Sequence, residues 1–504
     1  MLRLQSTVKS IKKRIGRLGQ SAFVIGLFSL FWFLLRTGTK PTRAVYPCQR
    51  VAATNSYLWF TIYVIPFFHT VLRKFSNINI TRRKIIALTV LAIVSTGSVV
   101  SWRLYEMWTQ PKQEAKKLIL EGWTAKKTPT SDIFVINGTK GGDEGVTELI
   151  NLMGEHGLFF YKSPKAGKNK GPNGLIARDD VVIIKVNSQW DERGGTNTDL
   201  LKMLIRAILD HPDGFIGEII IADNGQAQYG SAGSGGSLSW SRNNAEDPSQ
   251  SVQKVVDMFS DSHKVSTYLW DSITTKRVKE YEDGDMEDGY VVNETVNPRT
   301  GIMVSYPKFK TKFGTYVSFK MGIWNPETQT YDSERLKVIN MPVLKTHSGY
   351  GVTACVKHYM GVVSDKLTRN LGARAHNTVG TGGMGTEMVE TRFPVLNIID
   401  AIWVNAVPNR GPRTPYNTAT RINVIAASRD PVALDYWAAK YVLMKVAELN
   451  GYRDRSSMDP DNSSPGYFGN WLMLSMDEII RAGYQSTMDE DHMNVYISNL
   501  ESNP

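Results

Sequence analysis

Residues 181–186 read VVIIKV, residues 199–209 follow with a helical pattern, and residues 218–223 read EIIIAD. The two apolar runs are rich in β-branched side chains and almost unbroken, which is typical of strands that are buried on both faces of a sheet. Neighbouring parallel strands need a crossover connection, and the helical pattern between the two runs supplies one. This unit therefore predicts an α/β fold.

Strand and helix patterns also alternate on both sides of this unit. Toward the amino end the sequence predicts a strand at Ile133–Asn137 and a helix from about Glu144 to His156. Toward the carboxyl end it predicts three strands, Leu336–Leu344, Leu396–Ile402 and Ile422–Ser428, and two helices, around Val352–Gly361 and from Pro431 to about Glu448. Asp430 before Pro431 is a strong helix start, because aspartate caps the first turn and proline needs no N–H there. We expect a mostly parallel sheet wrapped by helices in a soluble domain over residues 126–504.

One segment departs from this pattern. Residues of about 276–330 alternate acidic turns with tyrosine, valine and lysine, as in EDGDMEDGY at 282–290, and they predict a small antiparallel insertion. The acidic residues of this segment have the wrong spacing for a calcium-binding loop, so we interpret them as a solvated turn. The glycine- and serine-rich stretch 226–244 is predicted to be a loop, and it contains neither established phosphate-binding glycine pattern.

Polar side chains stand where the predicted strands end. Lys185 and Asn187 end the first run, and Asp223 ends the second. Ligands of open α/β sheets bind beyond the carboxyl ends of the strands, so we expect these three residues to bind substrate. Lys345 and His347 end a third strand and share one of its faces, because side chains alternate along a strand. A cation beside an imidazole can hold a carboxylate or phosphate, or the imidazole can ligate a metal.

The following segments add further candidates. Lys357 would be a second cation, so Lys345, His347 and Lys357 form the predicted catalytic group, and Gly361 on the same helix face would admit a ligand or another backbone. Asp400, Asp435 and His358 are predicted to orient these groups or to ligate a metal. Asp435 lies in the apolar stretch VALDYWAAKYVL, where a carboxylate is expected to pair with a cation. A buried structural ion pair is the alternative for Asp435.

Six segments together resemble one family, and they occur in the same order: IIKVN at 183–187, IADNG at 221–225, VINMPVLKTH at 338–347, VKHYMG at 356–361, IIDAI at 398–402 and SRDPVALD at 428–435. The family is the one catalogued as domain of unknown function 362, and the resemblance covers roughly Asp179 to Met444. Its name assigns no activity. Many members look like α/β proteins fused to ferredoxin-type cysteine motifs, which implies an external redox partner. Cys48 and Cys355 are the two cysteines of this chain, too few for an internal iron–sulfur cluster.

The first hundred residues contain three uncharged windows bracketed by arginine or lysine: Leu18–Leu35, Val51–Leu72 and Ile85–Trp102. A hydrocarbon core of roughly 30 Å needs about 20 helical residues, so the windows predict an all-helical membrane anchor over residues 1–125. We expect two to three transmembrane helices, at about 18–36, 51–72 and 85–103, and a juxtamembrane helix from Ser101 to about Ala125. The second window contains Pro66 and could kink or lie in the interface, and a cleaved signal peptide is the alternative for the first. The proline-rich residues 41–49 are expected not to be helical.

Charge separates the arm from the rest of the chain. The formal net charge of the 504 residues is +11, but residues 1–118 contain 19 Lys and Arg against 2 Asp and Glu, and the remainder contains 40 against 46. A basic, apolar arm on an acidic body predicts a lipid bilayer as partner and no nucleic acid. Basic clusters before the first window and between the second and third favour the cytoplasm, so the soluble domain is predicted to be extracytoplasmic if all three windows span.

Two functions remain open at this stage, and the sequence does not decide whether the protein is an enzyme. In the first, a membrane-anchored enzyme binds a small anionic substrate through Lys185, Lys345 and Lys357, and His347 acts as acid–base group or ligates a divalent metal. This hypothesis predicts a deep pocket around these residues. In the second, the chain is a non-catalytic binding or assembly module whose lysines and carboxylates form structural ion pairs, such as Lys345 with Asp435.

Overall fold

A computed structural model of the chain describes residues 23–33, 47–64, 66, 115–226, 243–247 and 249–500. The chain divides into two compact units, Met1–Lys112 and Gln113–Pro504. In the first unit residues 23–33 are helical, and α2 (Pro47–Trp59) continues into the π-helical turn η2 (Phe60–Val64). The described helices include none that combines the length and the apolar character needed to cross a membrane.

The three predicted membrane windows are covered by the described residues to different extents. The windows at 18–36 and 51–72 lie only partly within the described residues, and the window at 85–103 lies outside them. The expectation that residues 41–49 are not helical is wrong at its end, because α2 begins at Pro47. Proline is accommodated there because the first turn of a helix does not use its backbone N–H groups.

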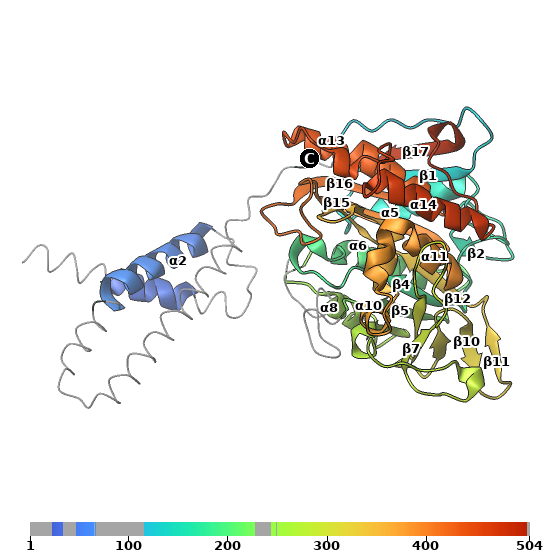
Figure 1. Cartoon of the computed structure of the whole chain (residues 1–504). Coiled ribbons are helices and arrows are strands. Elements are labelled where there is room, and N and C mark those ends of the chain that lie inside the picture. The colour runs from blue at the N-terminus through green and yellow to red at the C-terminus, as the bar shows by residue number, and fades with distance from the viewer. Residues whose placement is uncertain are drawn as a thin grey trace, which may run out of the picture. The chain divides into compact units, whose positions relative to one another are not determined.

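The second unit is built on a ten-stranded sheet (Figure 1). Its strands follow in the spatial order β17 (Met493–Asn499), β1 (Ser131–Asn137), β16 (Thr420–Ser428), β15 (Leu396–Asn405), β12 (Leu336–Asn340), β4 (Val181–Lys185), β5 (Glu218–Asp223) and β6 (Val265–Leu269). In addition, β13 (Val343–His347) pairs with β15 and with β14 (Gly351–Thr353). Strand β16 is antiparallel to its two neighbours, and every other pair along the main path is parallel. The predicted mostly parallel sheet is confirmed.

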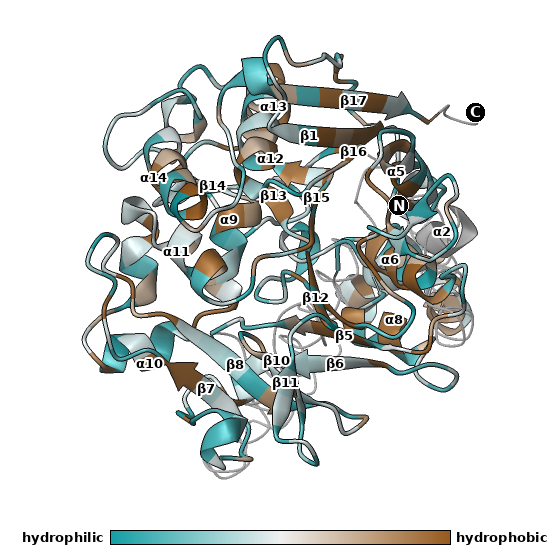
Figure 2. Ribbon diagram, turned by 90° about the vertical axis from the view of Figure 1, so that its right-hand side faces the viewer, coloured by the Kyte–Doolittle hydropathy of each residue, from teal (hydrophilic) through white to brown (hydrophobic). Residues whose placement is uncertain are grey.

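Helices cover both faces of this sheet (Figure 2). One face carries α5 (Gly145–Glu155), α6 (Thr198–Leu209) and α8 (Val252–Asp257), and the other carries α9 (Cys355–His358), α11 (Gly383–Glu390), α12 (Pro431–Trp437) and α14 (Phe468–Arg481). Alternate residues of β4 enter two separate cores: Val182 and Ile184 pack with the first group, and Val181 and Ile183 with the second. Burial on both faces explains why this strand reads as an unbroken apolar run.

The predicted antiparallel insertion is also confirmed. Five strands pair antiparallel in the order β11 (Thr330–Asp332), β10 (Gly322–Asn325), β9 (Tyr316–Ser318), β8 (Ser305–Lys310) and β7 (Gly289–Val292). Their residues fall almost entirely within the predicted span.

Three local predictions need correction. The strand predicted at Leu336–Leu344 is interrupted at residues 341–342, where Pro342 has no N–H for a ladder, and it forms β12 and then β13. The helix predicted around Val352–Gly361 is β14, the one-turn α9 and the 3₁₀ turn η6 (Tyr359–Gly361). The juxtamembrane helix is not seen at residues 115–125, where Trp123 instead pairs with Val495 of β17.

The helix predicted after Asp430 is confirmed. It comprises α12, the π-helical turn η8 (Ala438–Leu443) and α13 (Met444–Leu449). The Asp430 side chain accepts hydrogen bonds from the backbone N–H groups of Val432 and Ala433, as a helix cap does. A further α-helix among the described residues of this unit is α10 (Asp365–Asn370).

Candidate site at the carboxyl edge of the sheet

A buried ion pair joins the carboxyl ends of β4 and β5. Lys185 Nζ lies 2.8 Å from Asp223 Oδ1, and both side chains are buried. The other carboxylate oxygen of Asp223 accepts hydrogen bonds from the Ser188 backbone N–H and hydroxyl at 2.7 and 3.0 Å. Burial lowers the pKa of Lys185, and Asp223 opposes this shift. The strand ends therefore meet as predicted, but in this pair each charge already has its partner.

Gly361 lies directly against this ion pair. A Cβ atom at position 361 would lie 2.0 Å from Asp223 Oδ1 and 2.6 Å from Lys185 Nζ. The backbone N–H of Asn224 also donates to the Gly361 carbonyl oxygen at 3.1 Å. The space predicted at Gly361 for a ligand or a backbone is thus occupied by the charged ends of Lys185 and Asp223.

Lys345 has a different environment. Its side chain is buried, and its ammonium donates to the backbone carbonyl oxygen of Gly194 at 2.5 Å. It makes no ion pair with a carboxylate in the part of the chain that the structure describes. Burial lowers the pKa of Lys345 to about 7, an effect that Asp223 opposes and Lys357 increases. Among the described residues, the buried amine of Lys345 is thus bonded only to a neutral oxygen.

Lys357 on α9 is the second buried amine. Its Nζ lies 5.5 Å from the centroid of the Tyr350 ring, and it makes no hydrogen bond or ion pair with another described residue. Burial lowers the pKa of Lys357 to about 7, and Asp365 opposes the shift. Asp365 itself is bonded to Arg374, whose Nε lies 2.9 Å from Oδ2. No described carboxylate is therefore bonded to either lysine.

His347 lies beside these amines in its neutral form. Burial lowers the pKa of His347 to about 2, and Lys357 adds to the shift. The Gly349 backbone N–H donates to Nδ1 at 3.0 Å, so the neutral ring carries its proton on Nε2. The ring centroid lies 5.9 Å from that of His376 and 5.5 Å from that of Tyr350.

His376 is a candidate that the sequence did not reveal. It lies in the 3₁₀ segment η7 (Ala375–Thr381), and burial together with Lys357 lowers its pKa to about 4. It comes from a segment without strand or helix periodicity, so no spacing rule links it to His347.

The remaining predicted residues are engaged in hydrogen bonds within the fold. Asn187 Oδ1 accepts from the Val343 backbone N–H at 2.7 Å. Asp400 accepts from the backbone N–H groups of Asn197 and Ile402 and from the Asn244 amide, and burial raises its pKa to about 6. The His358 ring nitrogens lie 2.7 Å from Asn340 Oδ1 and 3.0 Å from the Val186 carbonyl oxygen. These contacts position the strand ends.

The prediction that Asp435 pairs with a cation is wrong. Its two oxygens accept hydrogen bonds from the backbone N–H groups of Cys355 and Val356, at 2.6 and 2.9 Å. These are the free N–H groups at the start of α9, which satisfy the carboxylate without a cation. Burial raises the pKa of Asp435 to about 7. The direct contact between Lys345 and Asp435 that the assembly hypothesis predicted is not among the interactions of the described residues.

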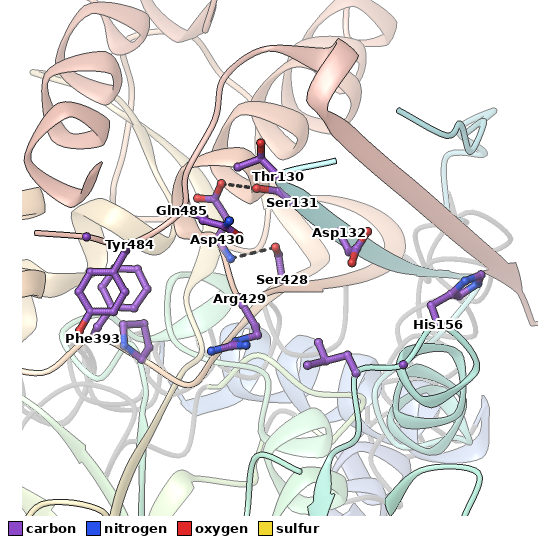
Figure 3. Close-up of a pocket in the computed structure, with 14 residues that line it drawn as sticks. Thr130, Ser131, Asp132, His156, Phe393, Ser428, Arg429, Asp430, Tyr484 and Gln485 are labelled. Atoms are coloured by element: carbon purple, nitrogen blue, oxygen red, sulfur yellow. Dashed lines mark hydrogen bonds between the residues drawn. The ribbon is translucent and has the colours of Figure 1, made fainter. Parts of the chain in front are cut away.

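Two observations bear on the remaining expectations. Within the described ranges, no three His, Cys, Asp or Glu side chains are grouped so that they could hold a metal ion. A cavity of about 440 Å³ is present, but none of the nine predicted site residues lines it (Figure 3).

A comparison with known families supports part of the resemblance seen in the sequence. The family model described as "Domain of unknown function (DUF362)" matches residues 333–440, a segment that contains Lys345, His347 and Lys357. No protein with a curated description matches the chain.

Proposed function

We propose that the α/β domain binds a small anion at the carboxyl edge of the sheet. Lys345 and Lys357 supply the positive charge, and the Nε2–H of His347 supplies a further donor. The observation that carries this proposal is the contrast among the three buried lysines at this edge of the sheet: Lys185 has a carboxylate partner, and Lys345 and Lys357 have none among the described residues. A buried charge without a partner is costly, so a carboxylate or phosphate bound here would stabilise both amines in their charged form.

The same site has the chemistry for catalysis. A lysine with a pKa near 7 is partly unprotonated at neutral pH and is suited to act as a general base or nucleophile. Perturbed pKa values cluster at functional sites, and here two lysines and two histidines within one group of side chains have them. In this proposal Lys185, Asn187, Asp223 and Asp400 are positioning residues.

The non-catalytic alternative is supported by different residues. The Lys185–Asp223 pair and the backbone-bonded carboxylate of Asp435 have the contacts of structural groups. If all of these residues were structural, no anion would bind. Whether an anion binds at Lys345 and Lys357 therefore distinguishes the two proposed functions.

We propose further that the first unit attaches the protein to a lipid bilayer, with the α/β domain outside the cytoplasm. Apolar side chains of the helix at residues 23–33 are open to solvent, among them Phe28 at 73% and Phe31 at 63% exposure. Exposed apolar groups of this kind favour a lipid or protein contact. The test is alkaline extraction of membranes that contain the full chain: retention in the pellet supports the attachment, and full release contradicts it. We also propose a divalent metal as cofactor and an external redox partner.

The anion-binding proposal is tested by calorimetric titration of the full chain with inorganic phosphate and with citrate. We expect the wild type to bind at least one of them, and Lys345→Met and Lys357→Met each to weaken binding at least tenfold. Lys202→Met, at a half-exposed position of α6, is the matched control and should bind as the wild type does. Absence of binding by the wild type, or unchanged binding in both site variants, would contradict the proposal.

A further inference from the structure

The cavity of about 440 Å³ lies at the opposite edge of the sheet from the candidate anion site. It is bounded by residues 393–394 before β15, residues 428–430 after β16 and residues 130–132 at the start of β1 (Figure 3). Because β1 and β15 begin there and the antiparallel β16 ends there, this is the amino edge of the parallel strands. Its volume of about 440 Å³ is in the range of small-molecule sites.

One wall of the cavity is aromatic. Phe393 and Tyr484 come from distant parts of the chain and stack with ring centroids 4.0 Å apart and an interplanar angle of 16°. Tyr484 is 40% exposed, so part of its ring is not covered by the protein. A planar group of a ligand can extend such a stack, which contributes beyond the area that it buries.

A cation that is unpaired among the described residues lies next to this wall. Arg429 is exposed, and its side chain extends between the Phe393–Tyr484 pair and His156 (Figure 3). Its guanidinium makes no hydrogen bond or ion pair with any other described residue. An arginine of this kind can bind a carboxylate or phosphate through two parallel hydrogen bonds.

Neither carboxylate of the cavity is paired with Arg429, because both accept hydrogen bonds from other described groups. Asp430 accepts hydrogen bonds from the Ser131 and Ser486 hydroxyls and from the backbone N–H groups of Val432, Ala433 and Thr487. Asp132 accepts from the Asn494 amide at 2.8 Å. A ligand would therefore meet, beside an aromatic surface, an arginine whose guanidinium is unpaired among the described residues.

We infer that this cavity, which we name the amino-edge site, binds a small planar anion. The carboxylate or phosphate of the ligand bonds to Arg429, and its ring packs on Tyr484. The ligand class is set by this pairing of charge and ring, which two kinds of molecule share: a nucleoside monophosphate and an aromatic carboxylic acid. The site shares no residue with the proposed anion site at the carboxyl edge, so either can fail without the other.

The test uses the full chain and four probes, with binding measured by calorimetry. Adenosine monophosphate and 4-hydroxybenzoate each combine a ring with an anionic group, adenosine has the ring without the charge, and inorganic phosphate has the charge without the ring. We expect at least one of the two planar anions to bind more tightly than inorganic phosphate, and adenosine monophosphate, if it is the one, to bind more tightly than adenosine as well. Which of the two binds identifies the source of the ligand.

Two variants and one control connect the binding to the cavity. Arg429→Gln and Tyr484→Leu should each weaken binding of the planar anion at least tenfold, whereas Arg453→Gln, an exposed arginine outside the cavity, should leave it unchanged. Since Arg429 is exposed and unpaired among the described residues, its variant should keep the melting temperature of the wild type. Failure of both planar anions to bind, or unchanged binding in Arg429→Gln, would overturn the inference.

Discussion

Lys185 and Asp223 form an ion pair of 2.8 Å at the ends of two adjacent parallel strands, and both charges are buried. Lys345 lies close enough to Asp223 for their charges to interact, but its ammonium is bonded to the Gly194 carbonyl oxygen. The Asp223 carboxylate thus forms an ion pair with Lys185 but interacts with Lys345 only over a longer distance. We therefore interpret Lys185 as a structural cation and assign Lys345 and Lys357 to ligand binding.

Removing one partner of the structural pair should destabilise the fold. Lys185→Met leaves the buried Asp223 carboxylate without its cation, and we expect a loss of roughly 3–5 kcal/mol in the free energy of unfolding, measured by urea denaturation. The double variant Lys185→Met with Asp223→Leu should recover much of that loss. A single variant as stable as the wild type would show that the pair has no structural role.

Gly361 should tolerate no side chain. The Cβ of Gly361→Ala would meet the Lys185–Asp223 pair at 2.0–2.6 Å, so the pair or the η6 turn must move, at a cost of about 1–3 kcal/mol. Gly380→Ala is the matched control, because its Cβ would meet only the Tyr350 ring at an ordinary 3.8 Å. Equal stability of the two variants would contradict the packing described here.

The stability of the fold should depend on alkaline pH because of Lys345. Its pKa is about 7 in the folded protein and about 10.5 in the unfolded chain, so between these values only the unfolded chain holds the proton. The contribution of Lys345 to the free energy of unfolding is therefore most favourable above about pH 10.5. This contribution is lost as the pH falls to about 7, by about 1.4 kcal/mol per pH unit.

Denaturation of wild type and Lys345→Met at about pH 7.5 and about pH 9.5 measures this effect. The wild type should gain about 3 kcal/mol more than the variant over that interval. An identical pH dependence in the two proteins would mean that the lysine titrates normally.

Glu387 on α11 should give the stability of the fold a pH dependence of the opposite sign. It is fully buried, neither carboxyl oxygen has a hydrogen-bond partner among the described residues, and burial raises its pKa well above the ordinary value. Below about pH 4.5 the carboxyl group is protonated in both the folded and the unfolded chain, and the titration of Glu387 does not lower the stability of the fold. As the pH rises toward the folded pKa, only the folded chain holds the proton, and stability is lost.

Glu387→Leu removes this group while keeping an apolar side chain. The variant should gain stability relative to the wild type as the pH rises above about 4.5, by up to about 1.4 kcal/mol per pH unit, in thermal or urea unfolding. A stability difference that does not change with pH would contradict the assignment of a protonated carboxyl group.

Local patterns predicted much of the fold. The unit β4–α6–β5 was predicted because burial on both faces leaves a visible mark, an apolar run without alternation. The antiparallel insertion was predicted because hairpins alternate polar and apolar residues. The break between β12 and β13 was missed, although Pro342 marks it.

The partners of the site residues were harder to predict, because they depend on tertiary placement. Asp435 was assigned a cation from its apolar surroundings, but the free N–H groups of α9 lie 79–80 residues away in the sequence and satisfy it instead. His376 carries no spacing signal. The amino-edge site combines Phe393, Arg429 and Tyr484, which meet only once the sheet has formed.

The most direct test of the anion site is the number of protons taken up on binding. Citrate, which is fully ionised at about pH 8.5, is titrated into the full chain in buffers of different ionisation enthalpy. If the bound anion raises the pKa of Lys345 and Lys357 from about 7 toward the ordinary value, the wild type takes up protons, and the double methionine variant takes up none. Citrate binding without proton uptake, or equal uptake in the double variant, would contradict the account.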